Sequence, residues 1–172
     1  MDDIILSSKF EKAIRNGDIG EIKLLTKDES CDVNQIIGNE QDEEGYLDNE
    51  RPLSLSLQNI KSENDKWFQI SQLLLEHKNV DVNARCGKTE WCTVLGTLCG
   101  TKCDSTLGVE MLLEDSRTDV NGGQYTPLFL ALSMIGAEDD YFYKIAFLLF
   151  DKKDIDVNHR CGQSSSTLRA LI

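Results

Sequence analysis

The apolar residues of this chain form short clusters with helical spacing, and the clearest of them lie between residues 126 and 158. A leucine-rich cluster follows Thr126-Pro127, where the hydroxyl can cap a helix and the proline can occupy its first turn. Further on, Ile145, Leu148 and Leu149 are three and four positions apart, which places them on one face of a second helix. The pattern predicts two short antiparallel helices, neither of which can bury its apolar face alone.

The same signature recurs along the chain. An Asp-Val-Asn triplet occurs four times, and each copy follows the end of a Leu-Leu pair by six or seven positions. The triplets begin at Asp32, Asp81, Asp119 and Asp156. Openings that resemble Thr126-Pro127-Leu128 stand at Arg51-Pro52-Leu53, Thr93-Val94-Leu95 and Ser166-Thr167-Leu168. A turn and two helices that recur with a period of roughly 33 to 50 residues are typical of a solenoid.

In these elements the chain resembles the ankyrin repeat family, whose unit opens on Thr-Pro-Leu-His-x-Ala and closes on a Leu-Leu helix and an Asp-Val-Asn turn. The resemblance covers nearly everything from about Ser8 onward, and residues 10–25 resemble a capping first repeat. It implies an all-α fold, an ankyrin-type solenoid of stacked antiparallel helix pairs with hairpin loops. At the position of the motif's His stand Ser54, Gly96, Phe129 and Arg169. We expect one domain, 1–172, with repeats at about 7–34 (a cap), 35–83, 84–121, 122–158 and 159–172 (partial, or a stunted cap).

Local signals place several helix boundaries. The spacing Ser8-x-x-Glu11 predicts a capping box that opens the first helix, and Gly17 predicts its end. The second helix of the next repeat is predicted to begin near Asp65. Residues 52–57 alternate between apolar and polar, which alone suggests a strand, but their place in the repeat predicts a helix.

The connection between the first two repeats is unusually long and acidic. The segment from Gln35 to Glu50 carries six acidic residues and no basic one, and Tyr46 interrupts the charge with an aromatic ring. A loop of this length and charge cannot bury its own backbone. It is either a projecting binding arm or a solvated insertion.

Composition narrows the classes of partner. Eighteen basic and thirty acidic side chains give a formal net charge of −12. A field of that sign repels phosphate backbones and anionic lipids, so we expect no nucleic acid and no membrane as partner, but another protein with a basic surface. Alternatively, the charge serves only solubility. The first residues lack a leader pattern, and no run approaches the roughly 20 apolar residues of a membrane span. We therefore expect a cytoplasmic monomer.

The chemistry-bearing residues do not form a catalytic motif. The six cysteines lack a C-x2-C pair, so reduced, mostly buried thiols are expected. A zinc site would need Cys99 and Cys103, one turn apart, with Cys92 and His77. Gly87-Lys88-Thr89 lacks the upstream glycine of a phosphate-binding loop. His159 and Cys161 form only a nominal dyad. We expect no enzyme activity, no cofactor and no metal.

The resemblance implies a protein-interaction module that binds through its concave face and hairpin loops. Contacts in the family come from the positions before the opening motif and near the end of the first helix, which correspond here to Arg15, Asn16, Glu50, Gln58, Asn59, Cys92, Thr101, Tyr125, Ser133 and Met134. Trp91 and Tyr46 are added because loop tips rarely expose large aromatic rings without a use, although Trp91 could instead pack beneath a neighbouring hairpin.

Two other classes of function remain open. The repeats could be the scaffold of a longer multidomain enzyme or effector whose activity lies outside these residues. Nucleic-acid binding is the third possibility, and the negative charge disfavours it.

Overall fold

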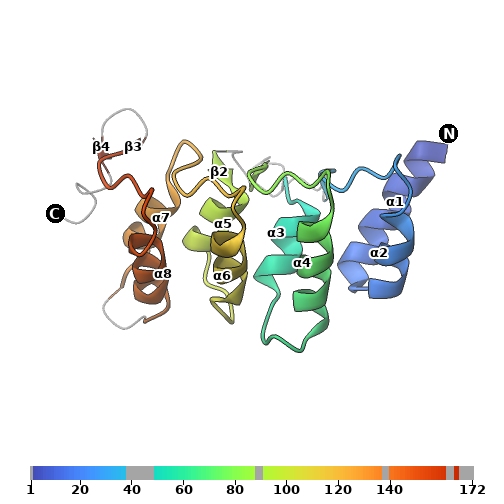
Figure 1. Ribbon diagram of the computed structural model, residues 1–172, viewed down its shortest axis with the longest axis horizontal. Helices are drawn as coiled ribbons and strands as arrows, with labels where there is room; N and C mark the ends of the chain where they lie inside the picture. The colour runs from blue at the N-terminus through green and yellow to red at the C-terminus, as the bar shows by residue number, and fades with distance from the viewer. Residues whose placement is uncertain (1, 38–48, 88–90, 137–139, 162–164, 167–172) are drawn as a thin grey trace, which may run out of the picture.

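The computed structural model describes residues 2–37, 49–87, 91–136, 140–161 and 165–166. Within these residues, eight α-helices form four pairs that stand side by side in one row (Figure 1). The pairs are α1 (Asp2–Asn16) with α2 (Ile19–Leu25), α3 (Pro52–Gln58) with α4 (Lys66–Glu76), α5 (Val94–Gly100) with α6 (Leu107–Glu114), and α7 (Pro127–Ser133) with α8 (Asp140–Phe150). The segment 52–57 is therefore helical, as its place in the repeat predicted. None of the described helices has both the length and the hydrophobicity to cross a bilayer.

Two hairpins between and after the pairs contain short strands, which the expectation of an all-α fold missed. β1 (Arg85–Cys86) pairs antiparallel with β2 (Cys92–Thr93), and β3 (Arg160–Cys161) pairs in the same way with β4 (Ser165–Ser166). A single bridge joins Ile37 to Glu50 at the base of the acidic connection. The fold is mostly helical, and strands of two residues are too short to leave a periodic signal in the sequence.

Side-chain caps begin four of the described helices. The hydroxyls of Thr93 and Thr126 each accept a hydrogen bond, at 3.2 Å, from the backbone N–H three residues on. The carboxylates of Asp18 and Asp65 do the same for α2 and α4, at 3.0 and 2.8 Å. These bonds satisfy N–H groups that have no partner inside the helix. The predicted starts near Asp65 and Thr126 are confirmed.

The first helix begins earlier than the capping box predicted. α1 starts at Asp2, so Ser8 lies within the helix and does not cap it. The turns of α1 that precede Ser8 are stabilised by Gln35, which lies outside the helix. The Ser7 hydroxyl donates to Gln35 Oε1 at 2.7 Å, and Gln35 Nε2 donates to the Ser7 carbonyl at 2.9 Å. This contact spans 28 residues, which a local sequence pattern cannot reveal. The predicted end is confirmed, since α1 stops at Asn16 and Gly17 has a φ of 63°.

One apolar core runs along the whole row. The helices of each pair contact each other and those of the neighbouring pairs, so each interior is shared. Leu25, Leu74, Leu112 and Leu149 occupy the same position before each triplet, and all four are buried. Between the second and third pairs the approach is closest at Gly108, where an added Cβ would lie 2.6 Å from the Leu57 carbonyl oxygen. A methyl group does not fit there.

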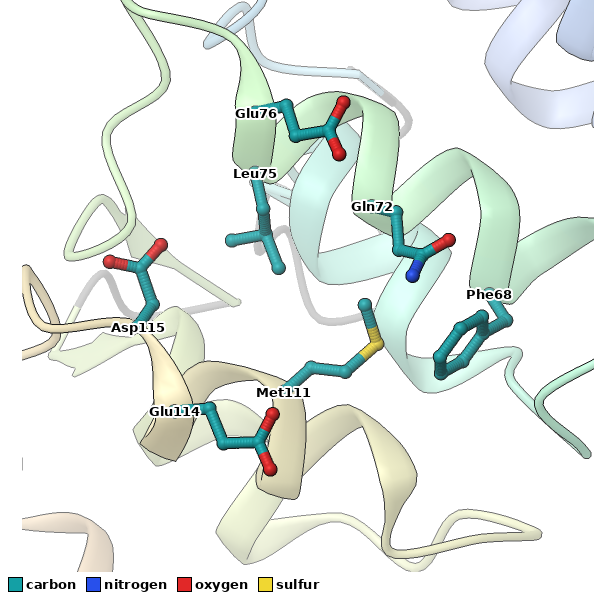
Figure 2. A pocket seen from close by; sticks show the side chains of 7 residues that line it. All are labelled: Phe68, Gln72, Leu75, Glu76, Met111, Glu114 and Asp115. Carbon is teal, nitrogen blue, oxygen red and sulfur yellow. The ribbon is translucent and has the colours of Figure 1, made fainter.

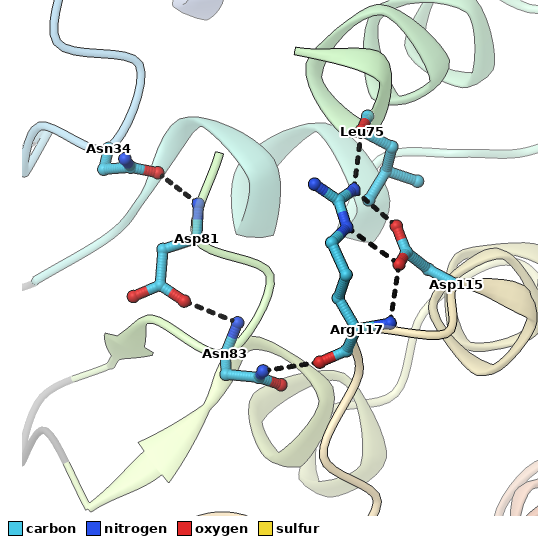
Figure 3. A network of polar contacts seen from close by, with 6 residues as sticks. All are labelled: Asn34, Leu75, Asp81, Asn83, Asp115 and Arg117. Carbon is cyan, nitrogen blue, oxygen red and sulfur yellow. Dashed lines mark hydrogen bonds and ion pairs between the residues drawn. The ribbon is translucent and has the colours of Figure 1, made fainter. Parts of the chain in front are cut away.

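The Asp-Val-Asn triplets join successive turns through a repeated pair of hydrogen bonds, which we call the turn ladder (Figure 3). Asn83 Nδ2 donates to the Arg117 carbonyl at 2.7 Å, and Asn83 Oδ1 accepts from the Asp119 N–H at 2.8 Å. Asn34 makes the equivalent bonds to the turn at residues 79–81, and Asn121 to the turn at residues 154–156, at the same distances. Each Asn therefore fixes the position of the next turn.

The aspartate of each triplet shapes its own turn. Its Oδ1 accepts a hydrogen bond from the N–H of the Asn two residues on, at 2.9 Å in all four copies. This bond is an Asx-turn, a local structure that Asp favours. Asp orients the Asn backbone, and the Asn side chain then reaches the neighbouring turn.

Arg117 adds a further link between the second and third helix pairs. Its Nη2 donates to the Leu75 carbonyl at 2.7 Å and also contacts Asp115 at 2.6 Å (Figure 3). This side-chain hydrogen bond from Arg117 is the main reason why the pKa of Asp115 lies below its usual range. The Leu75 carbonyl, near the end of α4, thus accepts a hydrogen bond from a residue of the next turn.

Replacing Asn83 with Ala removes both bonds between the second and third turns. At a net contribution of roughly 0.5–1.5 kcal/mol per hydrogen bond, we expect the free energy of unfolding to fall by about 1–3 kcal/mol. Denaturant unfolding of dilute protein measures it. Asn158→Ala is the matched control, because no partner for the Asn158 side chain is seen among the described residues; we expect a change within about 0.5 kcal/mol. Equal losses in the two variants would contradict the ladder.

Two glycines should respond to alanine in opposite ways. Gly108→Ala forces the backbones of α6 and α3 apart and should lower the free energy of unfolding by about 1–3 kcal/mol. Gly20→Ala, within α2, places its Cβ no closer than 3.4 Å to Asp18 Oδ1 and should raise it by about 0.5–1 kcal/mol. Thermal and denaturant unfolding compare the two. A tolerated Gly108→Ala would show that the close approach is wrong.

Candidate partner-binding surface

Three aromatic side chains form a continuous stack from the first hairpin to α7, and we call them the aromatic row: Trp91, Tyr125 and Phe129. The rings of Trp91 and Tyr125 are 5.8 Å apart and inclined by 52°, and those of Tyr125 and Phe129 are 5.5 Å apart and nearly parallel at 22°. Such offset arrangements are favourable for aromatic pairs. Trp91 is 43% exposed, so it packs on its neighbour with one side and presents the other to solvent.

The backbone holds the aromatic row in place. The Gln124 N–H donates to the Trp91 carbonyl at 2.7 Å, which fastens the hairpin to the turn before α7. Gly123 makes that turn possible with a φ of 99°, and a Cβ there would lie 3.0 Å from the carbonyl oxygens of Trp91 and Tyr125. Trp91 precedes α5 and Tyr125 precedes α7, so the row spans the junction between the third and fourth helix pairs.

The first helices of the last three pairs, α3, α5 and α7, which we call the inner helices, carry no charge. α3, α5 and α7 contain no Asp, Glu, Lys or Arg, whereas α4, α6 and α8 each contain at least one. In α7, Leu130 packs over Gly100 of α5, which brings the two inner helices close together. The net negative charge of the chain therefore lies elsewhere. Most residues of these three helices are buried, so the part that remains exposed is small and uncharged.

The predicted positions in the first two pairs are largely engaged within the chain. Arg15 Nε pairs with Glu11 at 3.1 Å, and the Asn16 carbonyl accepts a hydrogen bond from Lys66 at 2.9 Å. Gln58 Nε2 donates to Ser54, and Asn59 Nδ2 donates to the Leu55 carbonyl, both at 2.8 Å.

None of the predicted positions in the later pairs is buried. Cys92 is half-buried in β2, and Thr101 is exposed where α5 ends. Ser133 donates to the Phe129 carbonyl at 2.8 Å, and Met134, the C-cap residue of α7, is 48% exposed. The structure thus brings Trp91, Cys92 and Tyr125 together.

The acidic connection is described only at its ends. The Glu50 carbonyl accepts a hydrogen bond from the Ile37 N–H at 2.8 Å. Tyr46 lies outside the described residues, as do Lys88 and Thr89 of the Gly-Lys-Thr sequence.

Sequence reasoning missed two residues here. Phe129 completes the aromatic row, and its place at the His position of the repeat motif was the available signal. Arg51 stands where Thr93 and Thr126 cap their helices, but it makes no cap. Instead its guanidinium donates to the carbonyls of Asn34 and Arg85, across two turns. No local pattern indicates that role.

The thiols near this surface are not activated. Burial is the main reason why the pKa of Cys86 is raised, despite hydrogen bonds with Thr97 and Ser54. Burial also raises the pKa of Cys92, and the negative charge of a neighbouring Cys86 thiolate would add to the effect. Both thiols are therefore protonated at neutral pH and are weak nucleophiles.

The remaining chemical candidates were the zinc site and the pair formed by His159 and Cys161. Across the described parts of the chain, no group of three or more His, Cys, Asp or Glu side chains is placed to hold a metal ion. Cys99, the central ligand of the considered zinc site, is completely buried. Cys161 is also buried, with its Sγ 3.5 Å from Thr126 Oγ1 and 4.0 Å from the His159 carbonyl.

A groove of about 310 Å³ lies between the second helices α4 and α6 (Figure 2). Phe68, Gln72 and Leu75 from α4 face Met111 from α6, with carboxylates at the rim. One of these, Asp115, is held by Arg117. The groove marks how one second helix meets the next.

Comparison of the chain with models of known protein families and with curated proteins finds no match.

Gly123→Ala tests whether the turn holds the aromatic row. A positive φ costs a residue with a side chain about 1–2 kcal/mol, and the added methyl group would also press on two carbonyl oxygens. We expect a stability loss of at least that size and a weaker near-ultraviolet circular dichroism signal from the displaced rings. Gly136→Ala is the control, since a Cβ there has nothing within 4 Å. An unchanged aromatic signal in Gly123→Ala would show that the turn does not hold the row.

Proposed function

We propose that this chain is an ankyrin-type solenoid that binds another protein and catalyses no reaction. The observation that carries the proposal is the aromatic row, with the partly exposed Trp91 held against Tyr125 beside uncharged inner helices. Aromatic side chains that are fixed before binding lose little entropy in a complex and often dominate the binding energy.

Four similar helix pairs, a hairpin before α5 and the Asn-based turn ladder support the ankyrin-type assignment. In that architecture the inner helices and hairpin tips form one extended surface, which suits a protein better than a small molecule. The thiols of Cys86 and Cys92, both protonated at neutral pH, argue against a covalent mechanism at this place.

The distribution of charge favours two separate contributions to binding. The uncharged helices α3, α5 and α7 would supply close contact with apolar or neutral side chains. The overall charge of −12 would attract a basic partner from a distance. Electrostatic attraction of this kind raises the association rate more than it strengthens the final complex. We therefore propose a partner whose contact region is apolar and whose surrounding surface is basic.

Trp91→Ala tests the proposal once a partner has been captured from the native cell. We expect the binding free energy to weaken by more than about 1 kcal/mol, roughly fivefold or more in Kd. Ile5→Ala is the matched control, because it removes an apolar side chain of similar exposure, 52%, from α1, outside the aromatic row. Isothermal titration calorimetry with dilute protein measures both. Equal affinities for Trp91→Ala and the native chain, at equal thermal stability, would remove the aromatic row from the binding surface.

A further inference from the structure

The last helix of the row exposes three aromatic side chains along one face. Tyr143, Phe147 and Phe150 of α8 are 47%, 72% and 45% exposed, and their spacing of four and three residues aligns them on the helix. They are distinct from the aromatic row, because they belong to a second helix. At the position of Phe147, the three earlier pairs have the polar residues Lys23, Gln72 and Glu110. Only the last pair has an aromatic residue at this position.

The repeat itself identifies this face. Tyr143, Phe147 and Phe150 stand thirteen, nine and six positions before the Asp of their triplet. The same three positions in the second pair are Phe68, Gln72 and Leu75, which line the groove toward α6 (Figure 2). The aromatic face of α8 is therefore the face with which a second helix meets the pair that follows it.

The first pair exposes the opposite half of such a junction. Across the groove from α4, the facing apolar residue is Met111, eight positions before its triplet. The residue at that position in α2, the second helix of the first pair described, is Leu24, which is 62% exposed. Leu24 thus presents the surface that fits against the face of a preceding second helix.

The turn ladder is incomplete at both ends in a complementary way. Asn158 holds the place of Asn34, Asn83 and Asn121, but no partner for its side chain is seen among the described residues. At the first turn, the groups that would receive such an Asn are the Ser30 carbonyl and the Asp32 N–H, and the described residues offer them no partner either. The side chain of Asn158 therefore has the donor that the Ser30 carbonyl could accept from and the acceptor that the Asp32 N–H could donate to.

The charges at the two ends are also complementary. Lys27 and Asp151 both stand five positions before their triplets, and Glu29 and Lys153 both stand three positions before theirs. Lys78 also stands three positions before its triplet, and its Nζ lies 3.2 Å from Glu29. Residues at this position therefore already pair across a junction within the row. Joining the two ends would therefore bring together opposite charges at both positions.

From these features we propose that the chain assembles head to tail with a second copy of itself, with α2 of one copy seated on α8 of the next. The new junction continues the junctions between pairs, with Leu24 against Phe147 and Asn158 bonded to the first turn of the next copy. A heterologous contact of this kind leaves one free end on each side, so it builds rings or open filaments. The surface differs from the aromatic row, so the inference does not depend on the proposed partner.

Sedimentation velocity of the full chain over a wide range of concentration tests the assembly. The native chain should shift to species larger than a monomer as concentration rises. Leu24→Glu blocks one end and Phe147→Glu the other, so each variant alone should stay monomeric. Their equimolar mixture should form a dimer and nothing larger, because one intact α2 end and one intact α8 end remain. Gln69→Glu, which adds the same charge to an exposed position of the middle helix α4, should assemble like the native chain.

Each other outcome overturns the proposal. A native chain that stays monomeric at every concentration would show that the aromatic face is covered within the chain or meets only a different protein. Dimers of Leu24→Glu alone would show that two α8 faces meet each other. A mixture of the two variants that remains monomeric, with both folded by circular dichroism, would exclude the head-to-tail junction.

Discussion

The structure depends on a side chain that offers one donor and one acceptor at a fixed distance from the backbone. In the turn ladder, the carboxamides of Asn34, Asn83 and Asn121 each satisfy one carbonyl and one N–H of the next turn. An ionised Asp could only accept hydrogen bonds, and Gln would place its amide a methylene further out. The ladder therefore sets the spacing of the turns, and the spacing of the turns sets where the helices meet.

The ladder and the core stabilise the same junctions from two sides. The turns are joined at one edge of the row, and the leucines of the second helices pack below them. Because each pair shares its core with its neighbours, the stability of a pair resides largely in its junctions. The aromatic row lies across one of these junctions, since Trp91 precedes α5 whereas Tyr125 precedes α7. Its geometry is consequently a property of two pairs held in register.

Local signals in the sequence were enough for most helices but not for features that depend on distant contacts. The caps at Asp65 and Thr126 were predicted because capping is local. The start of α1 was missed because it depends on Gln35, far along the chain. The neutral inner surface was also missed, since net charge alone does not show where charges lie. Once the bounds of α3, α5 and α7 are known, their lack of charge can be read directly from the sequence.

The position of the candidate surface has a consequence for stability. In a linear array, each pair is held to the row only by its contacts with its neighbours. The pair formed by α7 and α8 is the last helix pair described; Tyr125 lies just before α7, and Phe129 lies in its first turn. A partner that contacts Trp91 and Tyr125 together also bridges the third and fourth pairs, so its binding energy opposes their separation. Partner binding and the integrity of the junction between the third and fourth pairs are thus thermodynamically linked, because both depend on the same contacts.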